Sequence, residues 1–326
     1  MSSSPVSRPL MEVRGLTVDY VGETSVARAV NGIDFDIREG EAFGLAGESG
    51  CGKSTVAFAL ARLTRLPGLV SGGSVRFGGE EVLSFGKARL KAYRWREVSF
   101  VFQSAMNALN PVIPVSEQIM DVIETHEPRL GEKGARARAV EMFELVGIPP
   151  ARLDDYPHQF SGGMRQRICI AIALALKPRL IIMDEPTTAL DVVVQRDIIE
   201  QIVELKAQLG FSVLFITHDL GLMIEFCDRI GVMYSGELVE VAPASSILTN
   251  PQHPYTKALG NSFPPLTGPR QRLEGIAGSP PDLRMLPKGC RFAPRCPHAM
   301  QVCADTAPEL RFYPAQQSEA ACHLLN

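Results

Sequence analysis

The period of the hydrophobic positions changes along the first 250 residues, and this change predicts the order of strands and helices. Residues 11–37 contain LTVDY and IDFDI, whose period-two pattern predicts antiparallel strands. Short strands are expected at 74–77 and 98–102, and fully apolar, buried strands at 42–46, 180–183 and 213–217. Helical patterns cover 56–63, about 120–176, and 192–209. The alternation predicts an α/β domain with a largely parallel central sheet.

The pattern weakens after about residue 250. Before that point, residues 231–234 and 237–241 flank Ser235-Gly236 and predict a hairpin. After it, prolines become frequent and regular elements are hard to assign. We interpret residues 251–326 as an irregular extension that is held by something other than a large core. Residues 11–250 would then form the main domain, with a helical part at about 104–176.

Composition narrows the function classes. The chain has 326 residues, 45% of them hydrophobic, which suits one large domain with an appendage. The net charge of −3 and the scattered Lys and Arg residues argue against a nucleic-acid binder. The longest apolar stretch, residues 168–176, is shorter than the roughly 20 residues of a membrane span. The N-terminus has no apolar signal-peptide core. We therefore expect any membrane work to go through partner subunits.

A glycine-rich turn follows the strand predicted at 42–46 and precedes a helix. It matches G-x-x-x-x-G-K-[ST], in the strand–loop–helix context that this phosphate-binding motif requires. The glycines let backbone N–H groups turn toward phosphate oxygens, and the helix N-terminus faces the same anion. Lys53 is expected to reach the β- and γ-phosphates, and the Ser54 hydroxyl to bind Mg²⁺. The loop comprises Gly47, Glu48, Ser49, Gly50, Cys51, Gly52, Lys53, Ser54 and Thr55.

Two carboxylates follow the buried strand at 180–183. Asp184 suits the Mg²⁺-binding acid of a nucleoside triphosphatase. Glu185 is expected to point to the other side of the strand and to polarise the attacking water. An acidic pair after a strand is common on surfaces, but a phosphate-binding loop in the same chain favours catalysis.

A third motif decides the family. Residues 160–166, with Ser161, Gly162, Gly163 and Met164, resemble the ABC signature motif and precede the acidic strand, as in that family. The resemblance extends to further positions in the right order: Gln103 of the Q-loop, Ala189, Leu190 and Asp191 of the D-loop, His218 of the H-loop, and Tyr20 as the aromatic that stacks on adenine. Met164 replaces the general glutamine, a mark of the peptide-import branch.

The resemblance implies a RecA-like core, an antiparallel β subdomain and a helical subdomain. It also implies ATP and Mg²⁺ as cofactors, with Ser54, Gln103 and Asp184 around the metal. Glu185, His218 and Gln103 would be catalytic. Two cassettes would meet head to tail, so that Ser161, Gly162, Gly163 and Met164 contact the partner's ATP and Asp191 links the two sites.

The subfamily follows from residues 107–111, residues 250–259 and the cysteine-containing tail, which resemble the ATPases of oligopeptide/dipeptide importers. This branch chiefly imports peptides, and some members carry oligosaccharides or nickel complexes. The resemblance implies a second, related ATPase subunit in a heterodimer, two transmembrane permease subunits and an extracytoplasmic substrate-binding protein. The chain would lie on the cytoplasmic face of the membrane.

Rival interpretations fit less well. An ABC ATPase of DNA repair would insert a long coiled coil between Gln103 and Ser161, for which there is no room. A translation-type ABC factor carries two cassettes, and an exporter commonly fuses its membrane domain to the cassette. A metal-binding regulatory protein with an incidental nucleotide fold would not need the complete catalytic set.

The tail cysteines Cys290, Cys296, Cys303 and Cys322 need their own explanation. A proline-rich tail with few apolar residues needs a staple, and disulfides are disfavoured on the cytoplasmic side. The spacing C-x5-C-x6-C-x18-C lacks the short knuckle of structural zinc sites. Four thiolates suit an iron–sulfur cluster, and the family resemblance points the same way. We therefore predict a 4Fe–4S cluster. The alternatives are His323 as a ligand, zinc, or four reduced thiols.

Overall fold

The structure is a computed structural model that describes residues 9–103, 108–188, 190–262 and 275–325. Its contacts divide the chain into two compact units. The first contains residues 1–38, 42–83 and 215–326, and the second contains residues 39–41 and 84–214. The two units are described separately below.

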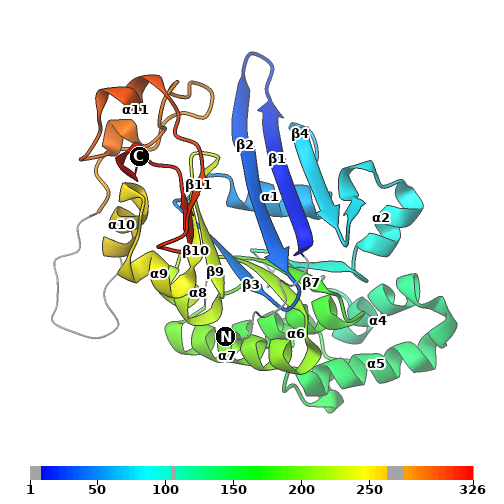
Figure 1. Ribbon diagram of the computed structural model, residues 1–326. Coiled ribbons are helices and arrows are strands. Elements are labelled where there is room, and N and C mark those ends of the chain that lie inside the picture. The colour runs from blue at the N-terminus through cyan, green and yellow to red at the C-terminus, as the bar shows by residue number, and fades with distance from the viewer. Residues whose placement is uncertain (1–8, 104–107, 189, 263–274, 326) are drawn as a thin grey trace, which may run out of the picture. The chain divides into compact units, whose positions relative to one another are not determined.

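An antiparallel sheet forms the first part of the first unit. Its strand order is β2-β1-β4-β5, and Figure 1 shows the long ribbons of β1 and β2 side by side. Apolar side chains of β1 are buried in two alternating pairs, Met11 with Val13 and Leu16 with Val18, because a strand places alternate residues on one face. A register shift separates the two pairs. The predicted antiparallel pair is therefore confirmed. The strands are β1 (Pro9–Val21), β2 (Val26–Arg38), β4 (Gly68–Phe77) and β5 (Glu80–Glu81).

A second sheet crosses the same unit in the order β11-β12-β10-β9-β3. The strand β3 (Ala42–Ala46) is wholly buried and runs parallel to β9 (Arg229–Tyr234). The strands β9 and β10 (Glu237–Pro243) form the predicted hairpin. Its turn residues Ser235 and Gly236 have φ of 45° and 88°, the left-handed pair that matches the twist of a two-residue hairpin.

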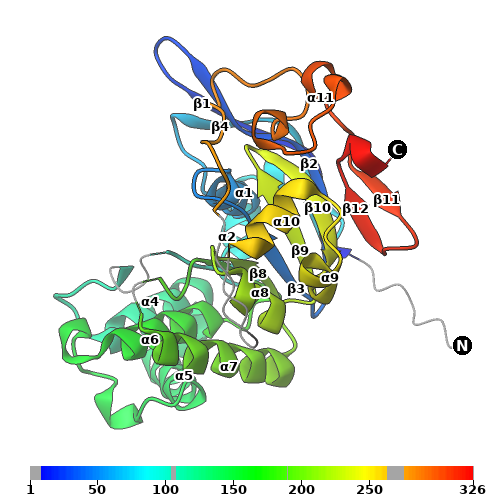
Figure 2. The same cartoon turned by 90° about the vertical axis from the view of Figure 1, so that its left-hand side faces the viewer.

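The C-terminal extension is more regular than the sequence predicted. The strands β11 (Arg311–Tyr313) and β12 (Ser318–Ala320) continue the sheet beyond β10, as Figure 2 shows. Helices α10 (Pro254–Asn261) and α11 (Gln301–Asp305) precede them. Helices α1 (Lys53–Leu60), α8 (Leu220–Phe226) and α9 (Ala244–Thr249) complete the first unit. These short strands were missed because the pattern of each spans only three residues. Pairing stabilises them, since β12 pairs with β10 and β11 pairs with β12.

The second unit is mainly helical. Helices α4 (Val115–His126), α5 (Gly131–Leu145) and α6 (Gly162–Leu174) pack against one another, as Figure 1 shows. The strands β6 (Val98–Val101) and β7 (Leu180–Asp184) form a parallel pair. Helix α2 (Lys87–Tyr93) precedes them, and α7 (Val192–Leu209) leads into β8 (Ser212–Ile216), within which the second unit ends at Leu214. In the part of the chain described, no helix is long and apolar enough to cross a bilayer.

Candidate functional site

The glycine-rich loop joins β3 to α1 inside the first unit. Gly47 and Gly52 have φ of 147° and 109°, values that side chains rarely permit. A Cβ atom at Gly47 would lie 2.3 Å from the carbonyl oxygen of Met233, and one at Gly52 would lie 2.3 Å from that of Ala29. Two neighbouring strands therefore press against the loop, and only glycine fits at both positions. The loop geometry predicted from the motif is thus imposed by close backbone packing.

Lys53 begins α1 and its ammonium group folds back over the loop. Its Nζ donates hydrogen bonds to the carbonyl oxygens of Gly47 at 2.7 Å and Glu48 at 2.9 Å. Ser54 and Thr55 follow in the first turn of the helix, whose N-terminal N–H groups and dipole favour an anion. The Tyr20 hydroxyl lies 3.3 Å from Thr55 Oγ1, so β1 places this aromatic beside the same turn. Loop, lysine and aromatic ring therefore lie together in the first unit.

In the second unit, β7 ends at the buried carboxylate of Asp184, which is 2% exposed. Glu185 follows with φ of 47°, so the backbone leaves the strand and the expected strand alternation does not apply. The Glu185 carboxylate accepts hydrogen bonds from Gln103 Nε2 at 2.7 Å and from Thr188 Oγ1 at 3.0 Å. The left-handed turn thus brings Gln103 and Glu185 together, which periodicity alone would not predict.

The signature sequence forms the start of α6. The Ser161 hydroxyl oxygen accepts a hydrogen bond from the Met164 N–H at 3.3 Å and caps the helix. A Cβ at Gly163 would lie 2.6 Å from Val194 Cγ1 of α7, so this position has room only for glycine. The short side chains therefore let the helix begin with its backbone donors near the surface.

Sequence reasoning missed Arg152, which supports this helix start. Its guanidinium lies 4.3 Å from the centre of the Phe160 ring and donates to the Gln159 carbonyl oxygen at 2.9 Å. It also lies 3.6 Å from Met164 Sδ. A lone arginine eight residues before a motif has no recognisable sequence signal, because its contacts depend on the intervening turns.

The remaining predicted residues lie in turns held by side-chain caps. Asp191 caps α7 by accepting a hydrogen bond from the Val194 N–H at 3.0 Å. His218 is exposed, two residues after the end of β8. The next residue, Asp219, donates its N–H to Thr217 Oγ1 and caps α8. Two other motif positions, Asn107 and Ala189, lie outside the residues that the structure describes.

The predicted iron–sulfur cluster is wrong. The described residues include all four tail cysteines, and among them no group of three or more His, Cys, Asp or Glu side chains is placed to hold a metal ion. Burial raises the pKa of the Cys290 thiol to about 11 and also raises the pKa of Cys296 and Cys322. His323 contacts the Thr306 carbonyl oxygen at 2.9 Å.

Apolar packing holds the extension in place of a metal. Phe292 is 1% exposed, and its ring lies 5.3 Å from that of Tyr234 and 5.4 Å from that of Tyr255. Tyr234 belongs to β9, so these rings attach the extension to the central sheet of the first unit. The tail needs no staple of its own, because its apolar residues pack against the sheet and do not form a separate core.

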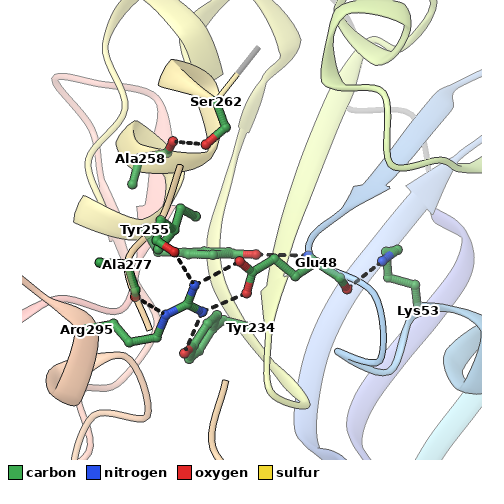
Figure 3. Close-up of polar contacts among 9 residues, drawn as sticks. Glu48, Lys53, Tyr234, Tyr255, Ala258, Ser262, Ala277 and Arg295 are labelled. Carbon is green, nitrogen blue, oxygen red and sulfur yellow. Dashed lines mark hydrogen bonds and ion pairs between the residues drawn. The ribbon is translucent and has the colours of Figure 1, made fainter. Parts of the chain in front are cut away.

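Two residues of the extension that sequence reasoning missed reach the phosphate-binding loop. The Tyr255 hydroxyl accepts a hydrogen bond from the Glu48 N–H at 2.9 Å. Arg295 forms an ion pair with the Glu48 carboxylate at 2.7 Å, as Figure 3 shows. Glu48 itself could have indicated from the sequence that a cationic partner lies nearby, because a negative charge inside a loop expected to bind an anion is unfavourable unless a cation pairs with it.

Known families match two parts of the chain. The ABC transporter family matches residues 30–188, and the family described as oligopeptide/dipeptide transporter, C-terminal region, matches residues 239–303. Among solved structures, the dimeric structure of the ABC transporter cassette MJ0796 is 26% identical with a TM-score of 0.65, covering 72% of this chain and 98% of that one. The fold and these loops define the chain as an ATP-hydrolysing ABC cassette.

Curated relatives match almost the whole chain. A probable peptide ABC transporter ATP-binding protein from Sinorhizobium fredii is 45% identical, covering 95% of this chain and 93% of that protein. The oligopeptide transport ATP-binding protein OppD from Salmonella typhimurium is 43% identical over 94% of this chain and 92% of its own length. The chain therefore belongs to the family of peptide ABC transporter ATP-binding proteins.

Proposed function

We propose that the chain hydrolyses ATP to drive the import of dipeptides or oligopeptides through a membrane permease. The observation that carries the proposal is that one chain joins an ABC cassette to the C-terminal region of oligopeptide/dipeptide transporters. The names of the relatives favour peptides over the oligosaccharides and nickel complexes that the sequence also allowed. The test is mass spectrometry of the ligand carried by the substrate-binding protein that copurifies with the intact complex. Peptides are expected, and a bound sugar or nickel complex would refute the assignment.

In the proposed site, the loop of the first unit binds the triphosphate. Lys53 neutralises the β- and γ-phosphates, Ser54 binds Mg²⁺, and Tyr20 stacks on the adenine. The position of Lys53 at the helix start and the Tyr20 hydroxyl 3.3 Å from Thr55 support these roles. His218, on its capped turn, is proposed to contact the γ-phosphate.

The second unit supplies the acids and the signature in this proposal. Asp184 binds Mg²⁺ with Gln103, and Glu185 orients the attacking water. The hydrogen bond of 2.7 Å between Gln103 and Glu185 supports a shared role, because it fixes the direction of the carboxylate. The start of α6 at Ser161 is proposed to bind the ATP of a partner cassette, with backbone donors at a helix N-terminus.

We further propose that the partner is a second, related ATPase subunit, and that two permease subunits and an extracytoplasmic substrate-binding protein complete the assembly. The chain would be peripheral on the cytoplasmic face of the membrane. Residues 11–250 would act as the cassette and residues 251–326 as an extension of it. Copurification from native membranes should give two different cassettes in equal amounts, and a complex holding only copies of this chain would refute the heterodimer.

A further inference from the structure

Glu48 presents an electrostatic problem within the phosphate-binding loop. It follows Gly47 directly, and the motif accepts any residue there. A loop that binds a triphosphate loses affinity when it also carries an uncompensated negative charge, because like charges repel across a partly solvated site. The Glu48 side chain is 26% exposed, so water screens it only in part.

Arg295 compensates this charge from the far end of the chain. It ends a short 3-10 helix, Ala293–Arg295, and its side chain is only 4% exposed. Its Nη1 donates to Glu48 Oε2 at 2.7 Å and its Nη2 donates to Glu48 Oε1 at 3.0 Å, which is the bidentate geometry of a strong ion pair. The hydrogen bond with Glu48 raises the pKa of the guanidinium further above its usual range.

The guanidinium is itself held in place on every side. Its Nε donates to the Ala277 carbonyl oxygen at 2.9 Å and its Nη2 to that of Ile276 at 3.2 Å. The Tyr234 hydroxyl accepts a third bond, from Nη1, at 3.2 Å. Figure 3 shows Arg295 in the middle of these partners. Because these hydrogen bonds fix the guanidinium, its position determines the direction of the Glu48 carboxylate.

The backbone of Glu48 is held as well. The Glu48 N–H donates to the Tyr255 hydroxyl at 2.9 Å, and the Glu48 carbonyl oxygen accepts from Lys53 Nζ at 2.9 Å. Tyr255 is itself fixed by His253, whose Nδ1 accepts the Tyr255 N–H at 3.0 Å. The extension therefore contacts both the side chain and the backbone of one loop residue.

We propose that Arg295 is a positioning residue for ATP binding. By pairing with Glu48 it neutralises that carboxylate and holds it in one direction, and so this one ion pair from the C-terminal extension sets the affinity of the loop for the nucleotide. This inference rests on the proposed function of the loop as the triphosphate site.

A purely structural role for the pair is the main alternative. The extension, however, has other anchors: Arg291 pairs with Glu237 at 3.1 Å, and Phe292 is buried. Arg291 is also buried, but its contacts go to β10 and to the hairpin turn at Ser235. It is therefore a matched control, because its loss perturbs the docking of the extension without releasing a charge in the loop.

The experiment measures the Kd of Mg-ATP for the full chain at low salt. Releasing one unit charge near the phosphates should weaken binding by roughly tenfold in Arg295→Gln. The loss should shrink at high ionic strength, which screens exposed charges. The double variant Glu48→Gln with Arg295→Gln should bind within about twofold of wild type, because no charge is left to repel the phosphates.

Three results would overturn the proposal: wild-type affinity in Arg295→Gln, a loss that the double variant does not recover, or an equal loss in Arg291→Gln. If Arg295→Gln does not fold, Arg295→Met takes its place with the same outcomes, since an uncharged side chain of similar length fills the space. Lys53→Ala separates the two proposals. If it loses ATP binding while Arg295→Gln does not, only the inference fails. If Lys53→Ala binds ATP normally, the proposed phosphate site itself fails.

Discussion

Replacing Glu185 with glutamine removes one charge and almost preserves the shape of the side chain. The carboxylate accepts hydrogen bonds from Gln103 at 2.7 Å and from Thr188 at 3.0 Å. An amide oxygen can accept the same two bonds, so the turn with its left-handed φ of 47° should survive. We expect the variant to fold with a loss in unfolding free energy of about 1 kcal/mol, the difference between charged and neutral hydrogen bonds.

The rate of hydrolysis should change far more than the stability. A positioned carboxylate that orients or deprotonates water contributes about 10²–10⁴ in rate, which corresponds to roughly 3–5 kcal/mol of activation free energy. A neutral amide takes up no proton at neutral pH, so Glu185→Gln should lose this contribution. The Kd for Mg-ATP should stay unchanged, because Glu185 is proposed to hold the attacking water, whereas Lys53 holds the phosphates and Ser54 and Asp184 hold Mg²⁺. The variant should therefore accumulate as an ATP-bound dimer.

The assay compares phosphate release at saturating ATP with equilibrium nucleotide binding in the same preparation. The matched control is Glu200→Gln, which makes the same charge change at an exposed position of α7 paired with Arg196 at 3.5 Å. Its turnover should equal that of wild type. Wild-type turnover in Glu185→Gln would refute the role of Glu185, and a parallel loss of ATP binding would show that the variant disturbs the site as a whole.

Three further predictions concern other parts of the chain. Lys53→Ala should weaken ATP binding roughly ten- to a hundredfold, the value of a charge-assisted phosphate contact, as checked by calorimetry. Ser161→Ala should remove the cap on the Met164 N–H and about 1 kcal/mol of unfolding free energy, together with turnover. Ser161→Asn should recover the melting temperature but not the turnover, and recovery of both would reduce Ser161 to a cap. Burial lowers the pKa of His253 from 6.5 to about 4. Because the unfolded chain takes up the proton first, stability should fall as the pH drops from about 6.5 toward 4, with about 2 kcal/mol lost by pH 5. In chemical denaturation, His253→Asn should lack this loss of stability. The buried Glu240 nearby has a raised pKa that acts in the opposite direction, but it is present in both proteins and so does not affect the comparison. Equal pH profiles of the two proteins would contradict the prediction.

The sequence alone was sufficient to predict those features that depend on a few consecutive residues. The limits of β3 at Ala42–Ala46 and of α7 at Val192–Leu209 match the predicted ranges, because each is a continuous pattern with a clear end. The hairpin turn at Ser235 and Gly236 was equally local. The family could also be read directly, because its loops are short sequences in a set order.

Other features depended on the path of the chain through space. Glu185 meets Gln103 because the backbone turns left-handed after β7, which strand alternation does not predict. The tail cysteines illustrate the opposite error. Their spacing suggested a metal centre, but the tail is attached by Phe292 against Tyr234 of the sheet. A count of apolar residues within the tail missed this contact, because the partner lies in another part of the sequence.

The ion pair between Glu48 and Arg295 shows most clearly the difference between what the sequence determines and what only the fold decides. The loop motif predicted a phosphate site in this segment, since glycine φ values and a helix start are properties of a few consecutive residues. The two charges stand 247 residues apart in the sequence. Many arginines could have paired with Glu48, and the choice of Arg295 depends on the hairpin, α10 and the 3-10 turn that bring it there. Local conformation can be read along the chain, whereas the pairing of distant charges is decided only when the folded backbone brings them within a few ångströms.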